Sequence, residues 1–271
     1  MKQLEYTIVI PVYNKEGFMI RCISSALNQT LAPSSILIID DASTDQSIKE
    51  ITPFLFDKRI KLIQLKKNGG TSKLLNEALR YIKTPYFIQL DGDDWLEPNA
   101  AKELVSALHS NPSAGFAYGN HHFYYYDKKN ELNNIKPMIA PNFENKYDLL
   151  LKLSFMINPR CYRTKSIIDM GGWIIDYPFD KWEGRFFEDV QMILRLANKY
   201  SWIHVNKFLH NITINMNTSQ HDGKLSLINF NHLRMSMYEY MLEEWGGEYS
   251  PLWNIESGYI LLKDLTFNKA K

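Results

Sequence analysis

The 271-residue sequence predicts an α/β fold in which a mostly parallel central sheet is covered by helices on both faces. Two observations predict this fold. Strand-length apolar runs alternate four times with helical patterns within the first hundred residues. The connections between these elements are also short, and repeated short β–α connections indicate parallel strands joined by right-handed crossovers.

Each element is predicted from its own pattern of apolar residues. The strands expected in the first half are 6–12, 35–39, 60–65 and 86–90. Helical spacing of apolar residues predicts helices at 17–29, 45–56 and 73–82, and another after Pro98. In the second half we expect strands at 115–126, 160–163, 201–205 and 208–215, a loop at 130–145, and helices at 165–170, from 189 to about 200, at 225–245 and at 259–267.

Composition excludes several classes of protein. The formal net charge is +1, so no basic surface indicates a nucleic-acid partner. Cys22 and Cys161 are too few for a disulfide framework and fit a reducing, cytoplasmic location. No stretch approaches the roughly 18 apolar residues that span a bilayer.

Four polar loops follow the predicted strands, at 13–17, 40–45, 68–72 and 91–94. Because parallel strands end at the same edge of a sheet, these loops should converge there. The last loop holds Asp91, Asp93 and Asp94, whose hard carboxylate oxygens suit Mg²⁺ or Mn²⁺ and, through the ion, a phosphate. The pair Gly69–Gly70 at a helix start can offer N–H groups to phosphate. The alternative is a solvated acidic turn that caps the next helix.

Four motifs in this order and spacing closely resemble the family 2 glycosyltransferases of GT-A fold. They are IPVYN at 10–14, IDDASTD at 39–45, NGG at 68–70 and DGDD at 91–94. The resemblance implies a Rossmann-like, mostly parallel central sheet with a smaller acceptor-side region and C-terminal helices. It also implies a nucleotide-sugar-binding half at 1–112, an acceptor-binding half at 113–223 and a C-terminal helical extension at 224–271.

The same resemblance implies the donor-site residues. It places Pro11, Tyr13 and Glu16 around the nucleoside base, and it makes Asp41 an acceptor of hydrogen bonds from that base. Asp91 would be the acid at the ribose, and Asp93 would be the ligand of Mn²⁺ or Mg²⁺. The other residues that it implies for the donor site are Gly70, Lys73 and Gly92. Leu75 stands where many relatives carry an arginine for the diphosphate, and Lys73 is the expected substitute. Tyr13 could instead be a strand-end aromatic and Asp41 a cap partner, and for Asp94 a surface position is favoured.

The acceptor side is implied by a weaker similarity that runs from Gly171–Trp173 through Glu188–Asp189 to Arg195–Leu196. Asp189 would be the catalytic base, with Glu188 as the fallback base or an orienting neighbour. The alternative is that this acid pair only caps a helix. Trp95 and Trp173 are candidate acceptor contacts, Trp95 being equally compatible with the core. A loose match places His221 near the metal and diphosphate, and a surface histidine fits as well.

The expected function is transfer of a sugar, with inversion, from a nucleotide-diphosphate donor to an acceptor hydroxyl. UDP is the family's commonest donor nucleotide, and the acceptor could be a glycan, a lipid-linked sugar or a protein in surface polysaccharide or glycoconjugate synthesis. A sugar nucleotidyltransferase and a non-catalytic nucleotide-sugar-binding protein are the alternatives. The apolar stripe of 225–245 could pack on its own domain, on a second copy in a homodimer, or peripherally on a membrane at its inner face.

Overall fold

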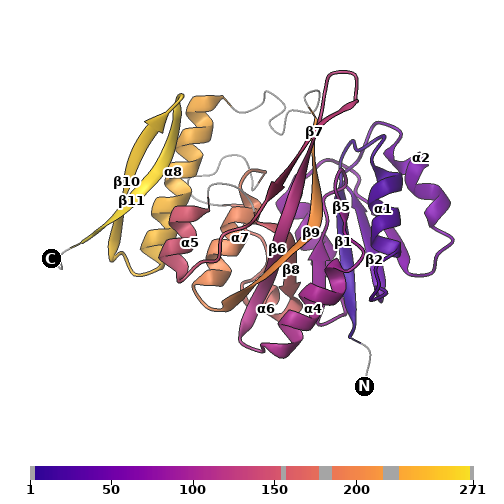
Figure 1. Cartoon of the computed structure of the whole chain (residues 1–271), viewed down its shortest axis with the longest axis horizontal. Coiled ribbons are helices and arrows are strands. Elements are labelled where there is room, and N and C mark those ends of the chain that lie inside the picture. Colours follow the sequence, from indigo (N-terminus) through magenta and orange to yellow (C-terminus); the bar gives the residue numbers. More distant parts are fainter. Residues whose placement is uncertain (1–3, 154–156, 177–184, 216–225, 269–271) are drawn as a thin grey trace.

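The computed structural model describes residues 4–153, 157–176, 185–215 and 226–268, and a nine-stranded sheet lies at its centre (Figure 1). The strands of this sheet are β1 (Tyr6–Val12), β2 (Ser35–Asp40), β3 (Ile60–Gln64), β4 (Tyr86–Gln89), β5 (Trp95–Leu96), β6 (Ala114–Tyr126), β7 (Leu132–Met138), β8 (Asn158–Arg163) and β9 (Ser201–Asn215). The helices are α1 (Met19–Leu27), α2 (Ser47–Ile51), the 3₁₀ turn η1 (Thr52–Phe54), α3 (Thr71–Leu79), α4 (Ala100–Ser110), α5 (Lys146–Lys152), α6 (Thr164–Asp169), α7 (Glu188–Ala197) and α8 (Leu227–Glu244).

Strand order in the sheet is β3-β2-β1-β4-β8-β6-β9-β5, with β7 paired to β6. Strands β1 to β4 pair in parallel, which confirms the predicted α/β class. The chain builds outward from β1 to β3 and then returns to place β4 on the other side of β1. The gap between the ends of β1 and β4 is therefore a topological switch point, where open α/β sheets bind ligands.

Two apolar clusters cover the two faces of the sheet. One joins the buried faces of α1 and α4 to the sheet, with Met19, Ile23 and Leu104 fully buried. The other gathers residues of α3, α5, α7 and α8 on the opposite face. This double cover explains why the central strands are continuously apolar, since a strand buried on both faces has no solvent-facing positions.

The second half attaches to the sheet through antiparallel pairing. Strand β8 pairs antiparallel with β4, and β6 pairs antiparallel with β8 and parallel with β9. The expected loop at 130–145 is wrong in its first part, because β7 pairs there with β6 as an exposed ribbon. Its side chains are mostly exposed, which explains why no buried-strand pattern marked it.

The C-terminal part lies at the far end of the molecule from α1 and α2 (Figure 1). The predicted helix at 225–245 is present as α8, and Tyr238, Leu242 and Trp245 of its apolar stripe are buried in the chain's own core. The helix expected at 259–267 is wrong: β10 (Tyr249–Glu256) and β11 (Tyr259–Phe267) form an antiparallel hairpin. Among the described residues, none of the helices is both long enough and apolar enough to cross a bilayer.

Candidate active site

A cavity of about 790 Å³ opens where β1 and β4 end. It brings together most of the predicted site residues from both halves of the chain. Those that line it are Pro11, Tyr13, Asp41, Gly70, Asp91, Gly92, Asp93, Glu188 and Asp189. The polar loops after the strands therefore do converge, and the pair at 188–189 faces them across the same space.

The backbone after β4 forms a tight turn against β1. The amide of Leu90 donates to the carbonyl of Val9 at 2.9 Å, and the amide of Asp94 donates to the carbonyl of Asp91 at 3.0 Å. A Cβ atom on Gly92 would stand 3.3 Å from the carbonyl oxygen of Pro11. A side chain at this position would thus require the end of β1 to shift by a few tenths of an ångström.

Each of the first two acids of the turn contacts a cation. Asp93 pairs with the ammonium group of Lys15, and Asp91 accepts from Arg160 Nη2 at 2.7 Å. Burial acts to raise the pKa of Asp91, but the charges of Arg160, His210 and Lys15 outweigh it and hold this pKa below its ordinary value. Asp91 is therefore ionised near neutral pH.

Asp41 has a local partner for each of its oxygens. Gly69 N–H donates to Oδ1 at 2.7 Å and Gly70 N–H donates to Oδ2 at 2.9 Å, and the side chain is buried. Gly70 has a φ of +85°, and a Cβ atom there would lie 2.7 Å from Arg185 Cγ. Asp41 thus fixes the glycine turn before α3, and the glycine lets Arg185 cross close above it.

On the opposite side, α7 places the second acid pair. Phe187 precedes the helix with φ 58° and ψ 18°, a left-handed conformation that turns the chain into the first helical turn. Asp189 Oδ1 accepts from the amide of Val190 at 2.8 Å, and its Oδ2 accepts from Arg160 Nη1 at 3.0 Å. Glu188 and Asp189 both line the cavity.

The acids on this side have raised pKa values. Burial, and then the charge of Asp189, raise the pKa of Glu188 well above its ordinary value. Burial also raises the pKa of Asp189, although Arg160 opposes this effect. Burial therefore disfavours the ionised form of Glu188, while Asp189 is the carboxylate that a guanidinium stabilises.

Four predicted residues do not line the large cavity. Glu16 is exposed and accepts from the amide of Gln46 at 3.1 Å. Trp95 stacks under the guanidinium of Arg21, whose Cζ is 3.7 Å from the ring centroid, and meets Tyr124 edge-on. The expectation of an acceptor contact at Trp173 is corrected, because this residue is 3% exposed and packs in the core.

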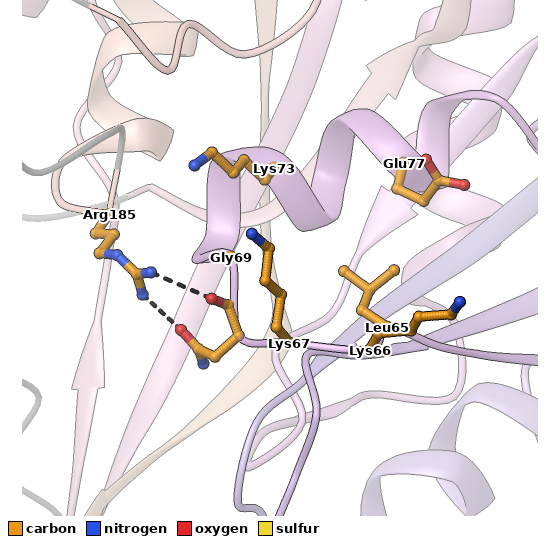
Figure 2. Close-up of a pocket in the computed structure, with 8 residues that line it drawn as sticks. Leu65, Lys66, Lys67, Gly69, Lys73, Glu77 and Arg185 are labelled. Carbon is orange, nitrogen blue, oxygen red and sulfur yellow. Dashed lines mark hydrogen bonds between the residues drawn. The ribbon is translucent and has the colours of Figure 1, made fainter.

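The fourth is Lys73, which lines a smaller cavity of about 510 Å³ beside the large one. Figure 2 shows Lys67 and Lys73 on the side of this space that faces Arg185, while Lys66 points away. Arg185 and Asn68 line both cavities, and Arg185 Nη1 donates to Asn68 Oδ1 at 2.5 Å. Lys73 therefore belongs to a basic hollow next to the predicted diphosphate position.

Two further expectations concern Asp94 and His221. Asp94 is not a surface acid: it is 5% exposed, accepts from the amide of Thr213 at 2.9 Å and pairs with His210. Burial raises its pKa to about 6. Asp94 thus ties the turn after β4 to β9. His221 lies outside the described residues.

Some lining residues escaped the sequence patterns. They are Lys15, Phe123, Asn158, Arg160 and Arg185. Arg160 carried a signal, because an arginine within a strand-like run needs a buried partner. The partner itself could not be found from spacing alone, since it depends on which strand lies next to β8.

The fold and the site together define a sugar-transferring enzyme of GT-A type. The sequence pattern of glycosyl transferase family 2 matches residues 7–171, well over half of the chain. The chain belongs to glycosyl transferase family 2.

Individual relatives match little more than a third of the chain. Chondroitin synthase of Pasteurella multocida strain Pm70 is 38% identical over 96 residues, which is 35% of this chain and 10% of that protein. The teichoic acid poly(glycerol phosphate) polymerase of Staphylococcus epidermidis is 38% identical over 116 residues, or 38% of this chain and 16% of that protein. The chain thus spans a small part of the curated relatives that it matches.

Solved structures share the fold. A fragment of S. aureus TarS in complex with UDP-GlcNAc has a TM-score of 0.63 at 18% identity, covering 88% of this chain and 66% of the fragment. The mannosyltransferase PcManGT from Pyrobaculum calidifontis, in complex with GDP-Man and Mn²⁺, has a TM-score of 0.55 at 14% identity, covering 80% of this chain and 58% of that one. At these identities the likeness establishes the GT-A architecture.

Proposed function

We propose that this chain transfers a sugar from a UDP-sugar to an acceptor hydroxyl with inversion, in the synthesis of a surface polysaccharide or glycoconjugate. The observation that carries the proposal is the large cavity, where Asp91 and Asp93 face Glu188 and Asp189. The S. aureus fold neighbour crystallised with UDP-GlcNAc supports a UDP-linked donor. The relatives that make chondroitin and poly(glycerol phosphate) support a polymer product.

The donor side suits a nucleoside diphosphate. Pro11 and Tyr13 line the cavity at the end of β1, where a base can lie against the aromatic ring. The turn fixed by Asp41 presents the start of α3, a nine-residue helix, toward the cavity edge. Backbone N–H groups and the helix dipole at such a start favour phosphate.

The donor set also suits a divalent metal ion. Asp93 and Asp91 offer hard carboxylate oxygens at the cavity wall. The described residues contain no group of three or more His, Cys, Asp or Glu side chains that could hold a metal, so substrate phosphates would complete the coordination, as is common for Mg²⁺. When bound, Mn²⁺ or Mg²⁺ would offset the negative charge that develops on the leaving diphosphate.

The acceptor side suits proton removal. Asp189 takes the proton of the acceptor hydroxyl while that oxygen forms its bond to the anomeric carbon. The bond from this carbon to the donor phosphate breaks at the same time, and the nucleoside diphosphate leaves with the electron pair. Attack from the face opposite the leaving group inverts the anomeric centre.

Calorimetric titration with UDP and with GDP in the presence of Mn²⁺ tests the donor site. A screen of UDP-sugars with candidate acceptors then tests transfer, scored by nucleoside diphosphate release and by the anomeric configuration of the product. We expect binding of UDP and an inverted product. If neither UDP nor GDP gave heat of binding, the proposal would be contradicted. Release of inorganic pyrophosphate during synthesis of a nucleotide sugar would identify a nucleotidyltransferase instead.

A further inference from the structure

Arg160 is a buried cation that contacts both edges of the large cavity. Its side chain is 2% exposed, and its two terminal nitrogens bond different carboxylates. Nη2 donates to Asp91 Oδ2 at 2.7 Å, and Nη1 donates to Asp189 Oδ2 at 3.0 Å. A single guanidinium therefore spans the acid that follows β4 and the acid in the first turn of α7.

The sheet fixes where this guanidinium can lie. Strand β8 runs antiparallel to β4, with Arg160 opposite Gln89 and Cys161 opposite Ile88. Gln89 also donates from Nε2 to Asp91 Oδ1 at 3.3 Å. Arg160 is therefore paired with a residue that lies two positions before Asp91 in the sequence. A planar guanidinium also loses little conformational freedom when it bonds two carboxylates.

We propose that Arg160 is a positioning residue for the transfer reaction, which holds Asp189 at a fixed distance and orientation from the donor-side Asp91. This inference rests on the proposed role of Asp189 as the base. Arg160 acts through the two carboxylates and needs no contact with either substrate. One buried side chain then sets the separation between the donor edge and the acceptor edge.

The bonds at Asp189 explain why its position depends on Arg160. Oδ1 is held by the amide of Val190 and Oδ2 by Arg160, so each oxygen keeps lone-pair capacity for the acceptor hydroxyl. The charged groups that face Asp189 are Arg160 from β8, Asp91 after β4 and Glu188 on its own helix. Replacing Arg160 removes the guanidinium that bonds this carboxylate.

The test compares Arg160→Lys and Arg160→Gln with a matched control, Arg163→Gln. Lysine keeps the charge but cannot hold two carboxylates with one planar fork, whereas glutamine removes both fork and charge. Arg163 lies three residues further along β8 and donates to the carbonyls of Ala114, Leu108 and Asn111, away from the acids. Its loss should lower the melting temperature and leave the turnover number of the folded protein unchanged.

The measurements are kcat, KM for the acceptor, UDP affinity with Mn²⁺, the melting temperature and the pH profile of kcat. A misplacement of ~1 Å in a reacting group costs ~10²-fold, so we expect kcat of Arg160→Lys to fall by ~10²-fold with a much smaller change in acceptor KM. In Arg160→Gln the acid limb of the profile should also move to higher pH, since Asp189 has lost its cation.

The inference is overturned if Arg160→Lys keeps the wild-type kcat, or if the loss in Arg160→Gln equals its unfolded fraction while the pH profile is unchanged. Should Arg160→Gln fail to fold, the charge-keeping lysine variant decides. The proposed function is tested by a different result: if the wild-type protein transfers no sugar, the proposed function is wrong. The proposed role of Arg160 is then wrong as well.

Discussion

The two edges of the large cavity treat their carboxylates in opposite ways. On the donor edge, Asp91 and Asp93 each contact a cation, and the pKa of Asp91 lies below its ordinary value. On the opposite edge, Asp189 bonds the guanidinium of Arg160 that also bonds Asp91, and burial raises the pKa values of both Glu188 and Asp189. Burial and neighbouring charges therefore shift the pKa values of similar carboxylates in opposite directions.

This difference is consistent with the proposed roles of the four acids. A carboxylate that stays ionised suits a metal ion and the phosphates it binds. A carboxylate whose pKa is raised toward neutrality is a better proton acceptor in a transition state. Under the proposed function, the edge with Asp91 and Asp93 would hold charge, and the edge with Glu188 and Asp189 would move a proton.

Asp189→Asn should have the largest effect on turnover. General-base removal typically costs 10²–10⁴-fold, so we expect kcat to fall by ~10³-fold while UDP affinity with Mn²⁺ is retained. Steady-state kinetics and calorimetry on the same preparation check both. Asp169→Asn, at an exposed acid that pairs with Lys165, is the matched control and should leave kcat unchanged. Normal turnover by Asp189→Asn would remove it from the mechanism.

The pH dependence of wild-type kcat should sharpen this assignment. The base acts when deprotonated, and burial raises the pKa of Asp189. Activity should therefore be lost, as pH falls, at a higher pH than for an exposed aspartate of pKa about 3.9. A pH–rate profile in a mixed buffer measures this limb. An acid limb at the exposed value would contradict a buried base.

Asp93→Asn should come next and should act through the metal ion. Electrostatic groups of this kind contribute ~10²-fold or more to turnover, so we expect metal-stimulated transfer to fall by ~10²-fold while the protein still folds. Rates over a Mn²⁺ titration and the melting temperature check the two parts. Asp57→Asn, which breaks a surface pair with Arg59, is the control. Full metal-dependent turnover in Asp93→Asn would place the ion elsewhere.

Lys15→Met should have a smaller effect, and one of opposite sign. The ammonium group of Lys15 pairs with Asp93 and would compete with a divalent ion for it. A partly exposed ion pair is worth at most ~1 kcal/mol, so its removal should tighten Mn²⁺ binding by up to ~fivefold. Calorimetric titration with Mn²⁺ and UDP measures the change. Weaker binding of UDP and Mn²⁺ would instead make Lys15 a phosphate contact.

Glu188→Gln should have the smallest effect. Because burial disfavours the ionised form of Glu188 and raises its pKa, a neutral amide of the same shape should disturb the site little. We expect kcat to change far less than in Asp189→Asn when both are measured on the same donor and acceptor. A loss as large as that of Asp189→Asn would move the base to Glu188.

The donor edge could be predicted because it is local in sequence. Asp91 and Asp93 follow their strand directly, and parallel pairing brings the other strand ends beside them. The ion pairs could not be predicted, because Arg160 meets Asp91 and Asp189 only through the pairing of β8 with β4. Asp94 was misplaced for the same reason, since its partner His210 lies on β9.

The C-terminal hairpin illustrates the limit of periodicity. Residues 259–267 fit a short helix as well as a strand, and the strand is decided by pairing with β10. The Ser257–Gly258 pair is a turn signal in the sequence. In the structure both residues have a positive φ, as a tight hairpin turn requires. Asn231 of α8 then bonds the hairpin through Gly258 and Ile260.

Phe187 gives this C-terminal part a consequence for the reaction centre. A phenylalanine in the left-handed region carries a conformational cost that surrounding structure must offset. Its ring packs against Phe230 of α8, with the centroids 5.0 Å apart. A truncation ahead of Leu227 would remove this contact, so we expect the residues from Leu227 onward to support the start of α7, where Glu188 and Asp189 lie.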